Sequence, residues 1–171
     1  MFGRIALRDI GIIALVVLAW HALAPLTAEE GALADALGVV LGLSVALACY
    51  FGHEWGHLAG ALATGSRVAA PDRLTRLSLF SFDSKANDRR QFVVMSFSGF
   101  AMTGVALLVV YFLLPDGLLA TRVARGGVLF STALTVVLEF PLVVWALVRQ
   151  DLPPVETFAP TAALESPPLE T

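Results

Sequence analysis

The chain has 171 residues, of which 57% are hydrophobic and 15% are charged, with a net charge of −3. This composition excludes an ordinary soluble domain of that length and predicts an all-α integral membrane protein. The single Cys49 excludes an internal disulfide framework.

Four stretches are apolar enough to cross a bilayer, which takes about 20 helical residues. They cover residues 10–26, 36–64, 92–114 and 127–148. The first could pass for a signal peptide, but no clear small-residue cleavage site follows it, so we expect a retained span. Residues 1–148 are predicted to form one integral domain in the lipid bilayer. Residues 149–171, rich in proline, have the composition of a disordered cytoplasmic tail.

Basic residues predict the orientation of these spans. Arg4 and Arg8 precede the first span, and six more lie in the loop 66–91, whereas the loop with Glu29 and Glu30 has none. The positive-inside rule then places both termini and the loop 66–91 in the cytoplasm, at the cell (inner) membrane. Arg122 and Arg125, expected in an outer loop, point weakly the other way. The basic loop lacks a helix or aromatic platform suited to bases, so no nucleic-acid partner is expected.

The second span contains the pattern H-E-x-x-H, as His53-Glu54-Trp55-Gly56-His57. Residues four apart share one face of a helix, so both histidines can bind one zinc ion (Zn²⁺). Glu54 would then face the metal and could take a proton from water and pass it to a leaving amine. The alternative is a pair of histidines hydrogen-bonded within a helix bundle. Two of the three histidines of the chain at ligand spacing favour the metal site.

The cytoplasmic loop contains a short apolar, partly alternating run at residues 77–83, which predicts a strand or small hairpin at the membrane surface. Phe80 and Phe82 are candidate substrate-binding residues, because an exposed strand edge can pair with an extended peptide. A strand that merely packs its own loop against the bundle explains the run equally well.

A catalytic zinc usually has three protein ligands, and Asp116 and Glu139 compete for the third position. Depth can be counted from the inner ends of spans two and four at about 1.5 Å per residue. On that count His57 and His53 lie roughly 12 and 18 Å deep, and Glu139 lies roughly 15 Å deep. Asp116 follows span three on the far side of a hydrocarbon core about 30 Å thick. Glu139 is therefore the predicted ligand.

Glu139 needs an explanation in any case, because an ionisable group inside a bilayer costs about 2.5–3.5 kcal/mol. Zinc would supply its partner. Pro141 should interrupt the helix beside the carboxylate and make room for water. The alternative is a protonated Glu139 that is hydrogen-bonded to a neighbouring helix.

These residues resemble the site-2 protease family of intramembrane zinc metalloproteases. The resemblance covers roughly residues 36–148 and includes Gly56 before the second histidine and the apolar run on both sides of the motif. It implies a core of three membrane helices, with the motif in the first, a membrane-associated hairpin after it and a metal ligand in the third. The chain resembles a minimal form, because it has no room for the PDZ domain that many relatives carry.

Two departures from the family pattern concern the later helices. Where the second core helix of the family commonly reads Ala-Gly-Pro-Leu-Ala-Asn, the chain has Ser98-Gly99-Phe100-Ala101-Met102-Thr103. Gly99 and Thr103 are thus candidate substrate-binding residues in an altered setting. Span four lacks the Asp-Gly motif of the family, and Glu139 stands in for its aspartate.

The sequence therefore predicts a zinc endopeptidase whose substrate is a membrane-spanning or membrane-proximal protein cut near the cytoplasmic face. An accessory membrane protein is a plausible further partner. One alternative is an inactive zinc-binding or substrate-binding protein on the same scaffold. The other is a structural membrane subunit with neither metal nor activity.

Overall fold

The computed structural model describes residues 1–71, 73–76, 78–149 and 151–153, so the predicted tail lies almost wholly outside the described residues. The described chain is all-α apart from two short strands. Four segments are long and apolar enough to cross a membrane, which confirms the predicted spans: Phe2–Ala28, Ala32–Ala63, Arg89–Leu113 and Leu119–Arg149. The helices within them are α1 (Phe2–Leu23), η1 (Ala24–Ala28), α2 (Ala32–Ala63), α3 (Arg89–Leu108), η2 (Val109–Leu113), α4 (Leu119–Leu138) and α5 (Phe140–Arg149).

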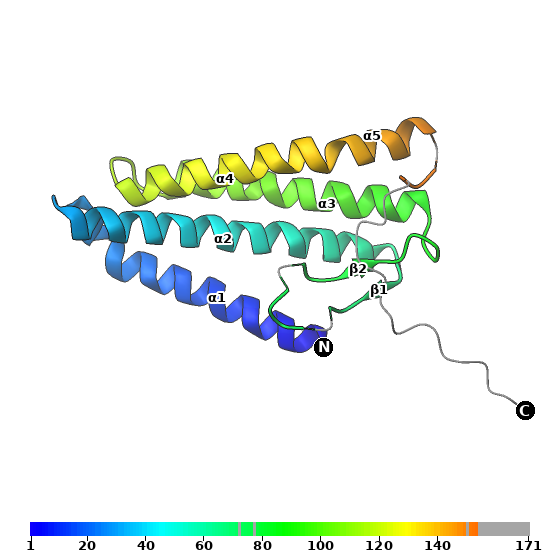
Figure 1. Cartoon of the computed structure of the whole chain (residues 1–171), viewed down its shortest axis with the longest axis horizontal. Helices are drawn as coiled ribbons and strands as arrows, with labels where there is room; N and C mark the ends of the chain where they lie inside the picture. Colours follow the sequence, from blue (N-terminus) through cyan, green and yellow to red (C-terminus); the bar gives the residue numbers. More distant parts are fainter. Residues whose placement is uncertain (72, 77, 150, 154–171) are drawn as a thin grey trace, which may run out of the picture.

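Helix α2 runs through the middle of the bundle, with α1 on one side and α3 and α4 on the other (Figure 1). Glycines allow these close approaches. A Cβ atom at Gly56 would lie 2.7 Å from the Ser98 carbonyl oxygen of α3, and one at Gly42 would lie 2.6 Å from the Ala120 carbonyl oxygen of α4. Small residues at such contacts are typical of helices that pack in membranes. The motif helix therefore packs closely against both α3 and α4.

Helix α4 begins at residue 119 rather than at 127, which corrects the placement of Arg122 and Arg125 in an outer loop. Both arginines lie within α4. The Arg125 side chain donates hydrogen bonds to the carbonyl oxygens of Val110 and Tyr111 and pairs with Asp116 at 2.7 Å. Carbonyl groups at a helix end have no partner within the helix. Arg125 thus provides hydrogen-bond donors for carbonyl oxygens at the end of the third span, where η2 has π-helical geometry.

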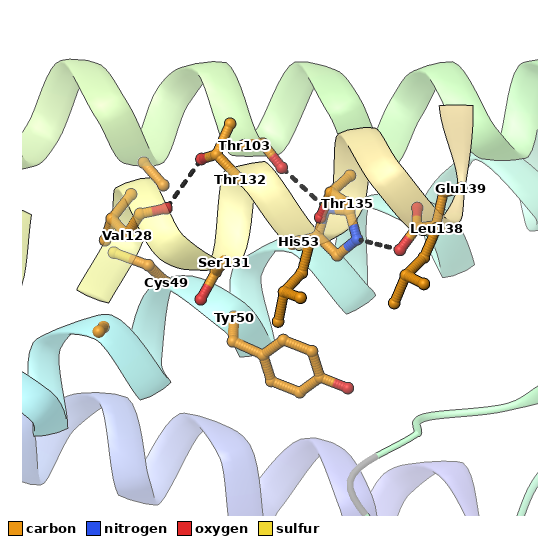
Figure 2. A pocket seen from close by; sticks show the side chains of 13 residues that line it. Cys49, Tyr50, His53, Thr103, Val128, Ser131, Thr132, Thr135, Leu138 and Glu139 are labelled. Carbon is orange, nitrogen blue, oxygen red and sulfur yellow. Dashed lines mark hydrogen bonds and ion pairs between the residues drawn. The ribbon is translucent and has the colours of Figure 1, made fainter. Parts of the chain in front are cut away.

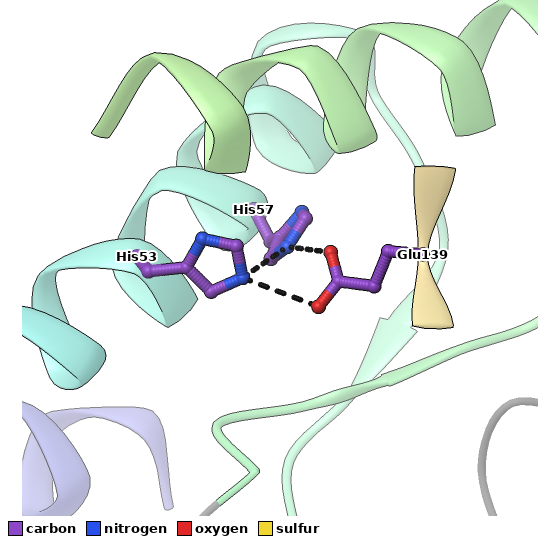
Figure 3. A group of neighbouring side chains, drawn as sticks. All are labelled: His53, His57 and Glu139. Carbon is purple, nitrogen blue, oxygen red and sulfur yellow. Dashed lines mark hydrogen bonds and ion pairs between the residues drawn. The ribbon is translucent and has the colours of Figure 1, made fainter. Parts of the chain in front are cut away.

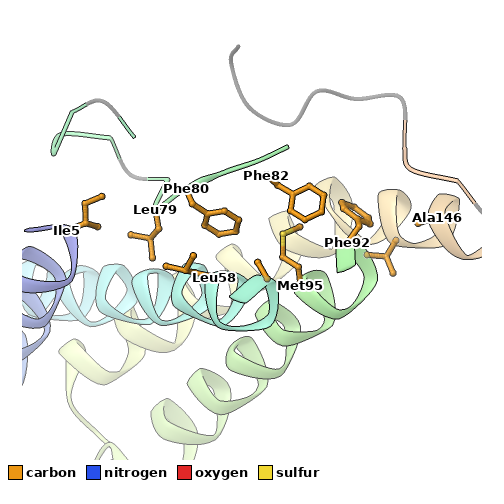
Figure 4. Close-up of a cluster of buried hydrophobic side chains, with 10 residues drawn as sticks. Ile5, Leu58, Leu79, Phe80, Phe82, Phe92, Met95 and Ala146 are labelled. Carbon is orange, nitrogen blue, oxygen red and sulfur yellow. The ribbon is translucent and has the colours of Figure 1, made fainter. Parts of the chain in front are cut away.

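The predicted strand is confirmed as β2 (Ser81–Phe82), which pairs antiparallel with β1 (Val68–Ala69). Leu77, the first residue of the predicted run, lies outside the described residues. Phe80 and Phe82 are 4% and 8% exposed, within a hydrophobic cluster that joins the loop to α1, α2, α3 and α5 (Figure 4). The structure therefore favours the reading in which the strand packs its own loop against the bundle.

The surface of the bundle is apolar along its length. Exposed large side chains occur on every long helix, among them Leu15, Val40, Phe112 and Val137. Such a surface suits contact with hydrocarbon rather than with water. The N terminus and the loop with β1 and β2 lie at the same end of the bundle (Figure 1). This agrees with the common cytoplasmic placement that the sequence predicts, and the orientation itself remains a prediction.

Candidate metal site

Glu139 lies at a break between two helices. Helix α4 ends at Leu138 and α5 begins at Phe140, so the interruption falls beside the carboxylate, where Pro141 predicts it. The Glu139 amide still donates to Thr135, and its carbonyl oxygen accepts from Leu142 at 3.0 Å. The break therefore leaves neither of these backbone groups unpaired.

A ring contact between α3 and α5 supports this break. The rings of Phe100 and Phe140 lie 6.4 Å apart, centroid to centroid. Phe100 is a residue of α3. Its ring packs against the first residue of α5 and so helps to fix the backbone beside Glu139.

Three side chains meet at one point of the bundle and form what we call the metal group: His53, His57 and Glu139 (Figure 3). The two Nε2 atoms of the histidines lie 2.9 Å apart. The Glu139 carboxylate extends from the break between α4 and α5, with 3.3 Å from Oε1 to His53 Nε2 and 3.2 Å from Oε2 to His57 Nε2. These residues could hold a metal ion, because ligands at tetrahedral angles around zinc lie about 3.3 Å apart.

Hydrogen bonds on the far side of each imidazole determine which nitrogen faces the group. His57 Nδ1 donates to the Met95 carbonyl oxygen at 3.0 Å, and His53 Nδ1 lies 3.1 Å from the Gly99 carbonyl oxygen. Carbonyl oxygens only accept, so both Nδ1 atoms carry the proton. Neutral rings then present two Nε2 lone pairs to each other and to a carboxylate. Such a set of atoms could hold a metal ion, and backbone carbonyls behind metal-binding histidines are the usual support.

Helix α3 is shaped to receive the two imidazoles. Thr103 Oγ1 lies 2.8 Å from His53 Nδ1 and adds a second acceptor beside Gly99. A Cβ atom on Gly99 would lie 2.2 Å from Cε1 of His57, so the ring can occupy its place only against glycine. The sequence marked Gly99 and Thr103 as candidate substrate-binding residues, whereas the structure places both in contact with the histidines.

The two other acidic candidates, Asp116 and Glu54, are not members of the metal group. Asp116 is at the opposite end of the bundle from the β-strands, with a side chain 88% exposed and paired with Arg125. This agrees with the depth argument for Glu139. Glu54 follows His53 on α2, is half-buried, and accepts a hydrogen bond at 3.4 Å from the Leu79 amide. Its carboxylate also interacts electrostatically with both imidazoles.

A cavity of about 200 Å³ opens beside the metal group between α2, α3 and α4 (Figure 2). His53 and Glu139 form one end of it. Three hydroxyl side chains of α4 also line it, together with apolar side chains. Two of these hydroxyls donate to carbonyl oxygens of their own helix, Ser131 to Gly127 and Thr132 to Val128. The cavity is smaller than a typical small-molecule pocket of about 300–1,000 Å³, so it offers room for water or a side chain rather than for a helix.

One buried acidic residue escaped the sequence analysis. Asp9 of α1 is fully buried, and its carboxylate accepts from the indole nitrogen of Trp55 at 3.0 Å. It precedes the apolar stretch that begins at residue 10, so hydropathy gave no reason to examine it. The sequence signal for Asp9 was its position directly after the oppositely charged Arg8.

Comparison of the chain with protein-family models, with curated proteins and with solved structures finds no match. The chemistry of the site is therefore argued from its own residues.

Proposed function

We propose that the chain is an intramembrane zinc endopeptidase, similar in its chemistry to the site-2 proteases. The observation that carries this proposal is the metal group itself. Two histidines of an H-E-x-x-H helix and a glutamate from a different span present acceptor atoms to one another at 2.9–3.3 Å. A metal ion could be held among them, and this donor set is one that catalytic zinc uses.

His53, His57 and Glu139 would hold the zinc, which when bound supplies a Lewis acid and acidifies water. Glu54 is the residue beside the first ligand whose carboxylate can accept a proton from water and return it to the leaving amine. The cavity next to His53 and Glu139 has room for water or for one side chain of a substrate. Because a helical peptide bond is shielded by its hydrogen bonds, the substrate must unwind before its carbonyl carbon can be attacked.

The choice of zinc rests on the ligand types. Two imidazoles and one carboxylate suit zinc better than magnesium or calcium, which prefer oxygen ligands. Glutamate completes zinc sites in other H-E-x-x-H enzymes. A shared proton among the three side chains is the rival explanation, and it would leave the purified protein without stoichiometric metal.

The test of this mechanism is the Glu54→Gln variant, which keeps the size of the side chain and removes its basicity. Hydrolysis of fluorescein-labelled casein in detergent should fall by about 10²- to 10⁴-fold. Zinc content should not change, because Glu54 is outside the metal group. Equal hydrolysis by the variant and the wild type would show that the mechanism is wrong.

A zinc-binding protein without turnover is the second candidate, and one observation favours it. Gly99 and Thr103, where substrate contacts were expected, instead contact the two histidines. Full zinc occupancy in wild-type protein with no Glu54-dependent hydrolysis would identify this second function.

A further inference from the structure

Helix α1 is joined to the motif helix through three side chains that we call the α1 clamp: Arg8, Asp9 and Trp55. The Asp9 carboxylate is fully buried, with Oδ1 2.6 Å from Arg8 Nε and Oδ2 3.0 Å from Trp55 Nε1. Trp55 is the residue directly after Glu54 in the motif. Both carboxylate oxygens are therefore engaged, one by α1 itself and one by the helix that holds the proposed catalytic base.

The Arg8 guanidinium extends the α1 clamp to the loop. Its Nη1 donates to the Leu74 carbonyl oxygen and, at 3.0 Å, to the Arg76 carbonyl oxygen. The guanidinium carbon lies 5.6 Å from the centre of the Phe51 ring, which holds it from the other side. Hydrogen bonds from a charged donor are stronger than neutral ones. The loop backbone is thus attached to α1 through a side chain that is itself fixed by Asp9.

The same loop contacts Glu54 a few residues further along. Leu79 is fully buried in the cluster that contains Ile5 of α1 and Leu58 of α2 (Figure 4). Its amide donates to Glu54 Oε2 at 3.4 Å. The loop is therefore bonded to Arg8 at Leu74 and Arg76 and to the carboxylate at Leu79.

We propose that Arg8 and Asp9 are positioning residues for Glu54, and that they act through the loop and through Trp55. The proposal rests on the endopeptidase function, because it assigns a role in the orientation of its general base. A base is effective only when it is held close to one geometry, and a displacement of about 1 Å can cost 10²-fold in rate. Helix α1 is in this account a part of the catalytic apparatus rather than an added membrane anchor.

The experiment compares Asp9→Asn and Trp55→Phe with wild type and with Arg4→Gln. Asp9→Asn removes the charge that fixes Arg8, and Trp55→Phe removes the indole donor while it keeps an aromatic ring. Arg4 is the matched control, because it is an exposed arginine one turn earlier on α1. Each protein is measured for zinc content, for hydrogen–deuterium exchange and for kcat and KM on fluorescein-labelled casein in detergent.

We expect Asp9→Asn to raise amide exchange in the loop around Leu79 by at least about tenfold, because a charged hydrogen bond is lost. The kcat should fall by about 10- to 100-fold with KM and zinc content unchanged. Trp55→Phe should also raise amide exchange in the loop and lower kcat, but by smaller factors. Arg4→Gln should match wild type in both measurements.

Three results would overturn the proposal. Unchanged exchange in the loop would show that the α1 clamp does not hold it. Faster loop exchange with an unchanged kcat would show that the loop does not position Glu54. Faster exchange throughout α1 and α2 with loss of zinc would show a general structural role. A failure of the proposed function looks different, because zinc-loaded wild type would then lack Glu54-dependent hydrolysis.

Discussion

Among the described residues, the metal group and the α1 clamp are two polar clusters that differ in how their hydrogen bonds are arranged. In the α1 clamp the two oxygens of Asp9 face two donors, the Arg8 guanidinium and the Trp55 indole. In the metal group two imidazole nitrogens and a carboxylate face one another, and all of them are acceptors once each Nδ1 proton is donated to α3. In the first cluster both carboxylate oxygens have a donor, while Nη2 of Arg8 is buried without a hydrogen-bond partner among the described residues. The second cluster could hold a metal ion.

This difference distinguishes charged residues that join helices from charged residues that could bind a ligand. A buried charge needs a partner, and a paired cluster such as the α1 clamp can hold elements together without any ligand. A cluster of acceptors beside a cavity can instead bind a metal ion. The two clusters lie on the same helix α2, at Trp55 and at His53 and His57, so variants in one provide controls for the other.

The largest effect on folding should come from a change in the α1 clamp. Asp9→Ala leaves the Arg8 guanidinium without its carboxylate, which should lower the free energy of unfolding by about 3 kcal/mol. Zinc content of the folded fraction should remain that of wild type, since the two clusters share no side chain. Denaturant titration in detergent, with Arg4→Ala as the control, measures the change. Unaltered stability would mean that the α1 clamp does not join α1 to α2.

A smaller effect is expected where α3 receives the imidazoles. In Gly99→Ala the new methyl group would lie 2.2 Å from Cε1 of His57 and must displace the ring. Zinc affinity should fall by about 10- to 100-fold, as for the loss of other groups that orient ligands. Gly104→Ala is the matched control, because a Cβ atom there has no neighbour within 4 Å among the described residues. Competition with a chelator measures both, and equal affinities would contradict the placement of His57.

The smallest effect should follow from Thr103→Val, which removes one acceptor from His53 Nδ1 and leaves the Gly99 carbonyl oxygen in place. We expect zinc affinity to fall by about tenfold, the lower end of the range for such supporting groups. Thr132→Val is the control, since the Thr132 hydroxyl bonds to its own helix at Val128. If both variants bind zinc as wild type does, His53 does not depend on Thr103 for its orientation.

Much of the fold was predictable, because apolar stretches and the spacing of a motif are local properties. The four spans, the strand near residue 80 and the break at Pro141 followed from hydropathy, alternation and the chemistry of proline. The pairing of Glu139 with the motif followed from counting depth along two helices. The spans, the strand and the break each needed information from a single helix or strand, and the pairing of Glu139 needed only the inner ends of two spans.

What the sequence did not predict depends on contacts between elements. Helix α4 starts at Leu119 because Arg125 bonds the end of the third span, and hydropathy treats such an arginine as part of a loop. Asp9 escaped notice because its partner Trp55 is 46 residues away. Gly99 and Thr103 were noted for a family resemblance, but their contact with the histidines depends on how α3 packs against α2.

The most direct test of the central claim is the zinc content per chain of purified wild type, Glu139→Ala and Asp116→Ala. We expect one zinc in wild type and in Asp116→Ala, because Asp116 is exposed at the far end of the bundle, and loss of zinc in Glu139→Ala. Folded wild type without zinc, or Glu139→Ala that retains it in full, would contradict the assignment of His53, His57 and Glu139 as a zinc site.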